Sequence, residues 1–65
     1  MPLFTFYPCR RDGSATAFET FEQRSDAEAR VRAAQILREH PSAVEVVIWQ
    51  GERRVGSVIR EGAHA

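Results

Sequence analysis

The most regular hydrophobic pattern in the chain lies between residues 25 and 40, which read SDAEARVRAAQILREH. Its polar positions fall on one stripe of a helix, at about 100° per residue. These positions are Glu28, Arg32, Gln35 and Glu39. The apolar positions, mostly alanine, fill the opposite side as a wide arc of roughly 220°. The pattern predicts one amphipathic helix whose apolar surface is wider than a single core needs.

Both ends of this helix carry sequence signals. Ser25 is followed three residues later by Glu28, which predicts a capping box. In it the serine hydroxyl accepts the Glu28 N–H, and the carboxylate reaches back to the Ser25 N–H. Pro41 disfavours helical geometry at the residue before it and so marks the end. Arg30 lies near the middle of the apolar arc and has two interpretations: its stem lies on the apolar surface while its charge reaches water, or it meets a charged partner across an interface.

Four short segments around the helix have the composition of β-strands, at residues 3–9, 15–21, 43–49 and 54–60. Between the first two, Asp12 and Gly13 predict a two-residue hairpin turn, in which both positions need positive φ.

The predicted turn sets the register of the first hairpin. It pairs Cys9 with Thr16, Tyr7 with Phe18, Thr5 with Thr20 and Phe4 with Phe21. In this register Glu19 falls on an apolar face, and a β-bulge that exchanges Glu19 with Phe18 is one remedy.

In the second hairpin, a four-residue loop over residues 50–53 gives the best hydrophobic match. It pairs Ile48 with Val55, Val46 with Ser57, Val44 with Ile59 and Trp49 with Arg54. A shorter loop at Gln50 and Gly51 is disfavoured, because it puts Arg53 opposite Ile48 on the core face. In the preferred register the Arg54 guanidinium can lie on the Trp49 indole.

The element order ββαββ predicts an α+β fold, with a four-stranded antiparallel sheet in strand order 2-1-3-4 and one helix packed on one face. The expected core consists of Phe4, Phe6, Phe21, Val31, Ile36, Leu37, Val44, Val46, Ile48, Val55 and Ile59. Pairing of hairpins between two chains, as a domain swap, is the alternative. We expect residues 1–65 to form a single small domain, with residues 61–65 as a frayed tail.

Composition narrows the possible functions. Nine arginines balance nine acidic residues, and a net charge of zero produces no long-range field that would attract nucleic acid or an anionic membrane. A single cysteine allows no internal disulfide, and with two scattered histidines it does not form a zinc site.

No segment has the pattern of a membrane span or a signal peptide, and a lone thiol suits a reducing cytoplasm, where we expect the protein to be. A core this small is marginal, so we also expect the chain to oligomerise.

Three stretches, FTFYPCRRDG, SDAEARVRAAQIL and VEVVIWQGERRV, cover most of the chain. Together they resemble a family of short bacterial domains of unknown function that share the strand-strand-helix-strand-strand order. The chain departs from that pattern at Arg10 and Arg11, where the family usually has a more acidic loop. The resemblance implies the fold and no activity.

The sequence contains no arrangement typical of catalysis. Cys9 precedes Arg10 and Arg11, which can lower the pKa of a thiol, but a strand-end cysteine without chemistry is the simpler interpretation. His40 falls in the last turn of the helix, where a positive charge is stabilising, and this role is commoner than that of a general base. We therefore predict no catalytic residue, no cofactor and no metal ligand, and expect a protein that is not an enzyme.

One helix can cover only one face of the expected sheet, so the second face is expected to be open. It carries Tyr7, Phe18, Val47, Trp49, Arg54 and Val58. Monomers rarely expose such a patch, so we expect it to bind a second copy of this chain, as a homodimer, or another protein. The alternative is single-stranded nucleic acid stacked on the aromatic rings, which the zero net charge disfavours.

The expected topology also gathers basic residues at one end of the sheet, where an anion or an acidic partner could dock. They are Arg10, Arg11, Arg38, His40 and Arg60. A solvated rim is the simpler interpretation, because the negative end of the helix dipole partly cancels their potential.

Overall fold

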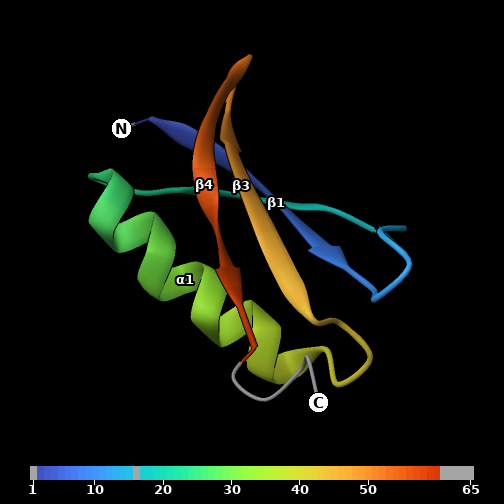
Figure 1. Ribbon diagram of the computed structural model, residues 1–65. Coiled ribbons are helices and arrows are strands. Elements are labelled where there is room, and N and C mark those ends of the chain that lie inside the picture. Colours follow the sequence, from blue (N-terminus) through green and yellow to red (C-terminus); the bar gives the residue numbers. More distant parts are fainter. Residues whose placement is uncertain (1, 16, 61–65) are drawn as a thin grey trace.

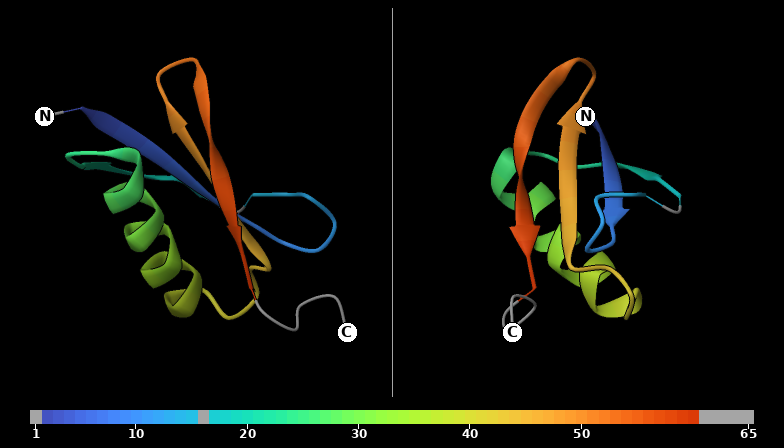
Figure 2. Two further views of the ribbon diagram at one scale, coloured as in Figure 1. Left: turned by 60° about the vertical axis from the view of Figure 1, so that its left-hand side comes forward. Right: turned by 45° about the vertical axis from the view of Figure 1, so that its right-hand side comes forward.

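The computed structural model describes residues 2–15 and 17–60 and has the element order predicted from the sequence (Figure 1). The elements are β1 (Leu3–Cys9), β2 (Glu19–Glu22), α1 (Asp26–Glu39), β3 (Glu45–Gln50) and β4 (Arg53–Ile59). All neighbouring strands are antiparallel, in the order β2-β1-β3-β4. The helix crosses one face of this sheet (Figure 2). The α+β fold and the strand order are therefore confirmed. The tail predicted at 61–65 lies outside the described residues, as does Thr16.

The helix begins with the capping interaction that the sequence predicts. Ser25 is the N-cap, and its hydroxyl accepts the Glu28 N–H at 3.2 Å. The Glu28 carboxylate accepts the N–H of Arg24 at 3.1 Å, one residue earlier than a standard capping box requires. His40 is the C-cap, directly before Pro41.

Only part of the wide apolar arc of α1 faces the sheet. The buried residues are Ala29, Ala33, Ile36 and Leu37, which form one stripe at helical spacing. The two alanines are fully buried, and their small side chains let the helix backbone lie close to the sheet. Val31, which we expected in the core, is 62% exposed, because it lies roughly 200° around the helix from Ala29.

The sheet side of the core comes from the two central strands. Its fully buried side chains are Phe4, Phe6, Val46 and Ile48. Along β1 the buried residues alternate with partly exposed ones, as expected for a strand with one covered face. Ala43 completes the buried cluster, with Phe21, Val55 and Val58 packed against it. Val44 and Ile59 were also expected in the core, but Val44 is only partly buried and Ile59 is 67% exposed.

The first hairpin has a different turn from the predicted one. Gly13 donates to the Arg10 carbonyl at 2.9 Å, and Arg10 donates to the Ser14 carbonyl at 2.8 Å. The loop therefore contains three residues, and only its glycine has positive φ, at 89°. An isolated bridge then pairs Cys9 with Ala15. The predicted Cys9–Thr16 pair is shifted by this extra loop residue.

The far end of the first hairpin has the predicted register. Phe4 pairs with Phe21, and Thr5 pairs with Thr20. One consequence is that Glu19 pairs with the buried Phe6 and faces the helix side of the sheet. No exchange with Phe18 occurs. Instead, His40 lies against Glu19, with Nε2 and Oε2 3.2 Å apart.

The second hairpin is shifted by one residue over most of its length. Trp49 pairs with Arg54 as predicted, but Ile48 pairs with Gly56, which leaves Val55 as an extra residue in a β-bulge. A one-residue shift moves side chains to the other face. Val58 therefore pairs with the buried Val46 on the helix side, whereas Ile59 pairs with Glu45 on the opposite side. The expected positions of Val58 and Ile59 were wrong for this single reason.

Two arginines of the second hairpin hold the two ends of the helix. The Arg53 guanidinium donates to both Asp26 carboxylate oxygens, at 3.0 and 3.3 Å, and this hydrogen bonding lowers the pKa of Asp26. At the other end, Arg60 donates to the carbonyls of Ala43 at 2.9 Å, His40 at 3.0 Å and Leu37. Arg60 thus adds a charged donor to the carbonyls at the helix terminus, where the regular intrahelical hydrogen bonds end.

Arg30 has neither of the roles considered from the sequence. Its guanidinium lies over Gly56 and donates to the carbonyls of Val55 and Ser57, at 3.4 and 3.5 Å. Gly56 has a φ of 154°, and a Cβ atom there would lie 2.5 Å from Arg30 Nη2. The missing side chain of Gly56 is therefore what lets Arg30 approach the strand.

We expect Ser25→Ala to lower the free energy of unfolding by about 1 kcal/mol, because the N-cap hydrogen bond is lost. In a domain of this size that corresponds to a fall of several degrees in the melting temperature. Thermal unfolding followed by circular dichroism measures it. Ser42→Ala, in the exposed loop after the helix, is the matched control and should leave the melting curve unchanged. Equal curves for the two variants would contradict the capping role.

We expect Gly56→Ala to destabilise the protein by about 1–3 kcal/mol, because alanine at this φ is strained and its Cβ displaces Arg30. In an Arg30→Ala background the same substitution should cost less, since only the backbone strain remains. Urea unfolding of the four chains of this double-mutant cycle gives the difference. Strictly additive effects would show that Arg30 and Gly56 do not interact.

Candidate functional site

The face of the sheet opposite α1, here called the open face, is organised as three rows of side chains across the strands. The strand registers align the Cys9 row (Cys9, Glu45, Ile59), the Tyr7 row (Tyr7, Val47, Ser57) and the Trp49 row (Thr5, Trp49, Arg54). These positions alternate with the buried residues of β1 and β3. No element of the described chain covers the open face (Figure 2).

Apolar side chains gather on the open face. Four large apolar residues of the described chain are strongly exposed, and three of them belong to this face. They are Leu3 at 55%, Phe18 at 62% and Ile59 at 67%. Phe18 precedes β2, but its ring centroid lies 5.8 Å from that of Tyr7, which places it beside the Tyr7 row. The fourth, Val31, lies on the helix.

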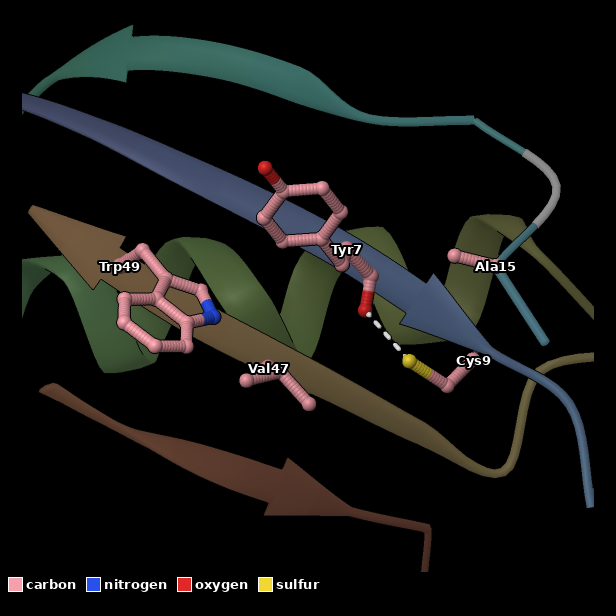
Figure 3. Close-up of a pocket in the computed structure, with 5 residues that line it drawn as sticks. All are labelled: Tyr7, Cys9, Ala15, Val47 and Trp49. Carbon is pink, nitrogen blue, oxygen red and sulfur yellow. Dashed lines mark hydrogen bonds between the residues drawn. The ribbon is translucent and has the colours of Figure 1, made fainter. Parts of the chain in front are cut away.

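A shallow hollow of about 370 Å³ lies in the middle of the open face, lined by Tyr7, Cys9, Ala15, Val47 and Trp49. Trp49 and Cys9 stand at its two ends, with Tyr7 and Val47 between them (Figure 3). The Cys9 thiol donates to the Tyr7 carbonyl at 3.3 Å. The lining is otherwise apolar apart from the Tyr7 hydroxyl and the indole N–H, so the hollow suits an apolar or aromatic group.

The Cys9 thiol is not activated. Burial raises its pKa, and the negative charge of Glu45 raises it further. The neighbouring arginines in the sequence therefore do not produce a reactive thiolate, which would need a lowered pKa.

The structure brings most of the predicted interaction residues together. Tyr7, Val47 and Trp49 occupy the open face, Arg54 lies directly opposite Trp49 in the register, and Phe18 contacts Tyr7. Val58 does not belong to this set, because it packs against the core.

Several further residues of the open face were not identified from the sequence. Among them are Leu3, Ala15 and Ile59. Leu3 could have been found from strand alternation alone. The position of Ile59 depends on the bulge at Val55, and that of Ala15 depends on the three-residue loop.

The predicted basic end contains groups that bind other parts of the fold. Arg60 is occupied by the carbonyls at the helix terminus, and His40 pairs with Glu19. Arg38 and Arg10 are exposed, while Arg11 interacts with another part of the chain. Two of the five groups that we expected to attract an anion therefore already have partners within the chain.

Among the described residues, two of the side-chain contacts with the edge strand β2 come from α1 and its C-cap residue. One is the His40–Glu19 pair, in which both side chains are about one third exposed. The other is Arg32, whose guanidinium carbon lies 4.4 Å from the centre of the Phe21 ring, a cation–π contact. The cation–π contact that we expected lay elsewhere, between Arg54 and Trp49.

No protein-family model, no curated protein and no solved structure matches the chain. The resemblance to short bacterial domains therefore stays an expectation from the sequence. Among the described residues, no helix combines the length and apolar character needed to cross a membrane. Within residues 2–15 and 17–60, no three histidine, cysteine or acidic side chains lie close enough to hold a metal ion. The site is accordingly interpreted from its own geometry.

Because Glu45 raises the pKa of Cys9, we expect Glu45→Gln to move the pH–rate profile of Cys9 alkylation to lower pH. Removing the negative charge stabilises the thiolate, so the lowered pKa gives more thiolate at a given pH. Iodoacetamide labelling followed by mass spectrometry gives the midpoint of the profile. Glu52→Gln removes the same charge in the turn at the far end of β3 and should leave the midpoint unchanged. Identical midpoints for both variants would contradict the effect of Glu45.

Proposed function

We propose that this protein is a small non-enzymatic protein-interaction or regulatory module that acts as a homodimer through its open face. The observation that carries the proposal is the concentration of exposed apolar side chains on that face, which carries Leu3, Phe18 and Ile59 as well as the aromatic hollow. Contiguous apolar patches of this kind mark interaction surfaces in soluble proteins. Aromatic residues at the centre of such a patch are the usual energetic anchors.

The size of the core supports association. One 14-residue helix covers a four-stranded sheet, and the fully buried side chains are few. Domains of this size usually need a further source of stability, such as a disulfide, a metal or a partner chain. The open face offers a partner chain apolar side chains that association would bury.

A non-enzymatic role fits the chemistry of the hollow. Its polar groups are a thiol, a phenol and an indole N–H, and the raised pKa of Cys9 disfavours nucleophilic attack. No acid–base pair adjoins it among the described residues, since His40 and Glu19 meet on the helix side of the sheet. A reduced Cys9 suits the cytoplasm, which we propose as the location.

The competing function is binding of single-stranded nucleic acid, with bases stacked on Tyr7, Phe18 and Trp49. The aromatic rings of the open face favour it. The zero net charge does not, because such proteins usually carry a basic surface that follows the phosphate backbone. Protein association is therefore the function that we favour.

We expect the protein to sediment as a dimer at tens of micromolar, and Trp49→Asp to convert it to a monomer by placing a charge in the hollow. Trp49 is the only tryptophan, so its emission reports on the open face. In the dimer it should be blue-shifted and resist acrylamide quenching. The matched control is Val31→Asp, which puts the same charge at an exposed valine on the helix and should leave the dimer intact.

A wild-type chain that sediments as a monomer would contradict the dimer. A dimer that Val31→Asp dissociates and Trp49→Asp does not would move the interface to the helix. Salt-dependent binding of labelled single-stranded RNA by a monomeric protein, lost in Trp49→Asp, would favour the nucleic-acid function instead.

A further inference from the structure

We propose that the two copies stack their open faces about a two-fold axis that crosses the strands at the Tyr7 row. This inference rests on the proposed homodimer and specifies its partner geometry. Such an axis reverses the strand direction of the second copy, so the Cys9 row of each copy lies against the Trp49 row of the other. Sheets that pack face to face keep their strand directions within about 30° of parallel or antiparallel alignment, which this arrangement satisfies.

The charges of the open face favour this axis. Glu45 lies in the Cys9 row and Arg54 in the Trp49 row, at opposite ends of the same face. Within the described residues, neither side chain makes a hydrogen bond or an ion pair. The proposed axis sets Glu45 of each copy against Trp49 of the other, one strand away from Arg54, so that the long Arg54 side chain can reach the carboxylate and both charges gain partners at once. An isologous contact repeats each pairing twice.

The alternative two-fold axis, parallel to the strands, places equivalent rows against each other. Glu45, on the central strand β3, then lies near the second Glu45, and Arg54 lies against a row that holds no acidic residue. Like charges placed together across an interface are strongly unfavourable. The position of these two residues therefore selects between two arrangements that bury the same apolar surface.

The hollow provides the second argument for the axis. It extends from the Cys9 row to the Trp49 row (Figure 3), so the proposed axis sets the Trp49 indole of each copy over the Cys9 end of the other hollow. Ala15 bridges to Cys9 at that end, and its methyl group leaves room for a ring. Each copy thus supplies the aromatic group that the hollow of the other is shaped to hold.

Charge reversal tests this arrangement. Glu45→Arg and Arg54→Glu each place like charges together, so each should weaken dimerisation at least about tenfold. The double variant Glu45→Arg/Arg54→Glu restores opposite charges and has the net charge of the wild type, so it should dimerise close to the wild-type affinity. Sedimentation equilibrium gives the dissociation constants, and circular dichroism confirms that each variant is folded.

Protection of Cys9 is an independent measurement on the wild-type protein. In the proposed dimer the thiol lies in the row that the Trp49 row of the second copy covers, so the maximal alkylation rate of Cys9 at high pH should fall as protein concentration rises through the dimerisation range. Two cysteines at opposite ends of the interface should also fail to form an intermolecular disulfide under mild oxidation.

The outcomes separate the two proposals. A monomeric wild type overturns the homodimer and this geometry together. A dimer that Trp49→Asp dissociates, but whose charge-reversed double variant is no tighter than the single variants, leaves the homodimer standing and overturns the axis. Rapid formation of a Cys9–Cys9 disulfide overturns the axis as well. Restored affinity in the double variant, together with concentration-dependent protection of Cys9, supports it.

Discussion

The single helix covers one face of the sheet, and the rest of the structure depends on how closely the helix packs against that face. Ala29 and Ala33 are fully buried against the sheet, which allows a short helix to seal a core of two phenylalanines and a few aliphatic side chains. Arg53 and Arg60 then fix the helix at its two ends. The consequence is a two-layer domain with all of its packing on one side and a second face that the described chain leaves open.

The parts of the fold that the sequence predicts correctly are those decided by local chemistry. The helix boundaries follow from Ser25 and Pro41, and the pairing of Phe4 with Phe21 follows from matching two apolar runs. The errors arise where a single residue is inserted. A third loop residue before Ser14 and an extra Val55 in β4 each shift a register by one, and alternation cannot detect such an insertion. Hydrophobic matching favours Val55 opposite Ile48, whereas the bulge puts Gly56 there and makes room for Arg30.

The open face could be predicted in outline but not in composition. Tyr7, Val47 and Trp49 lie on strands whose alternation is clear. The predicted register pairs Ile59 with Val44 on the core face, and only the bulge moves Ile59 to the open face. Contacts between segments that are distant in the sequence were the hardest to predict. His40 and Glu19 are 21 residues apart, and nothing in either local sequence indicates that a histidine would accompany a carboxylate on the core side of the sheet.

The contact between Arg30 and β4 has a consequence for how far assembly can proceed. The backbone N–H of Arg60 donates to the Val44 carbonyl at 2.8 Å. In an antiparallel pair only every second residue forms hydrogen bonds with the neighbouring strand. Ser57, three residues before Arg60, therefore directs its backbone groups away from β3, towards the free edge of the sheet. An exposed edge of this kind is a template for a further strand and hence for fibrous aggregates. The carbonyl of Ser57 instead accepts from Arg30, and that guanidinium lies where an added strand would need to approach. The proposed association through the open face, together with a β4 edge that Arg30 occupies, favours a closed assembly over a sheet that grows by adding strands.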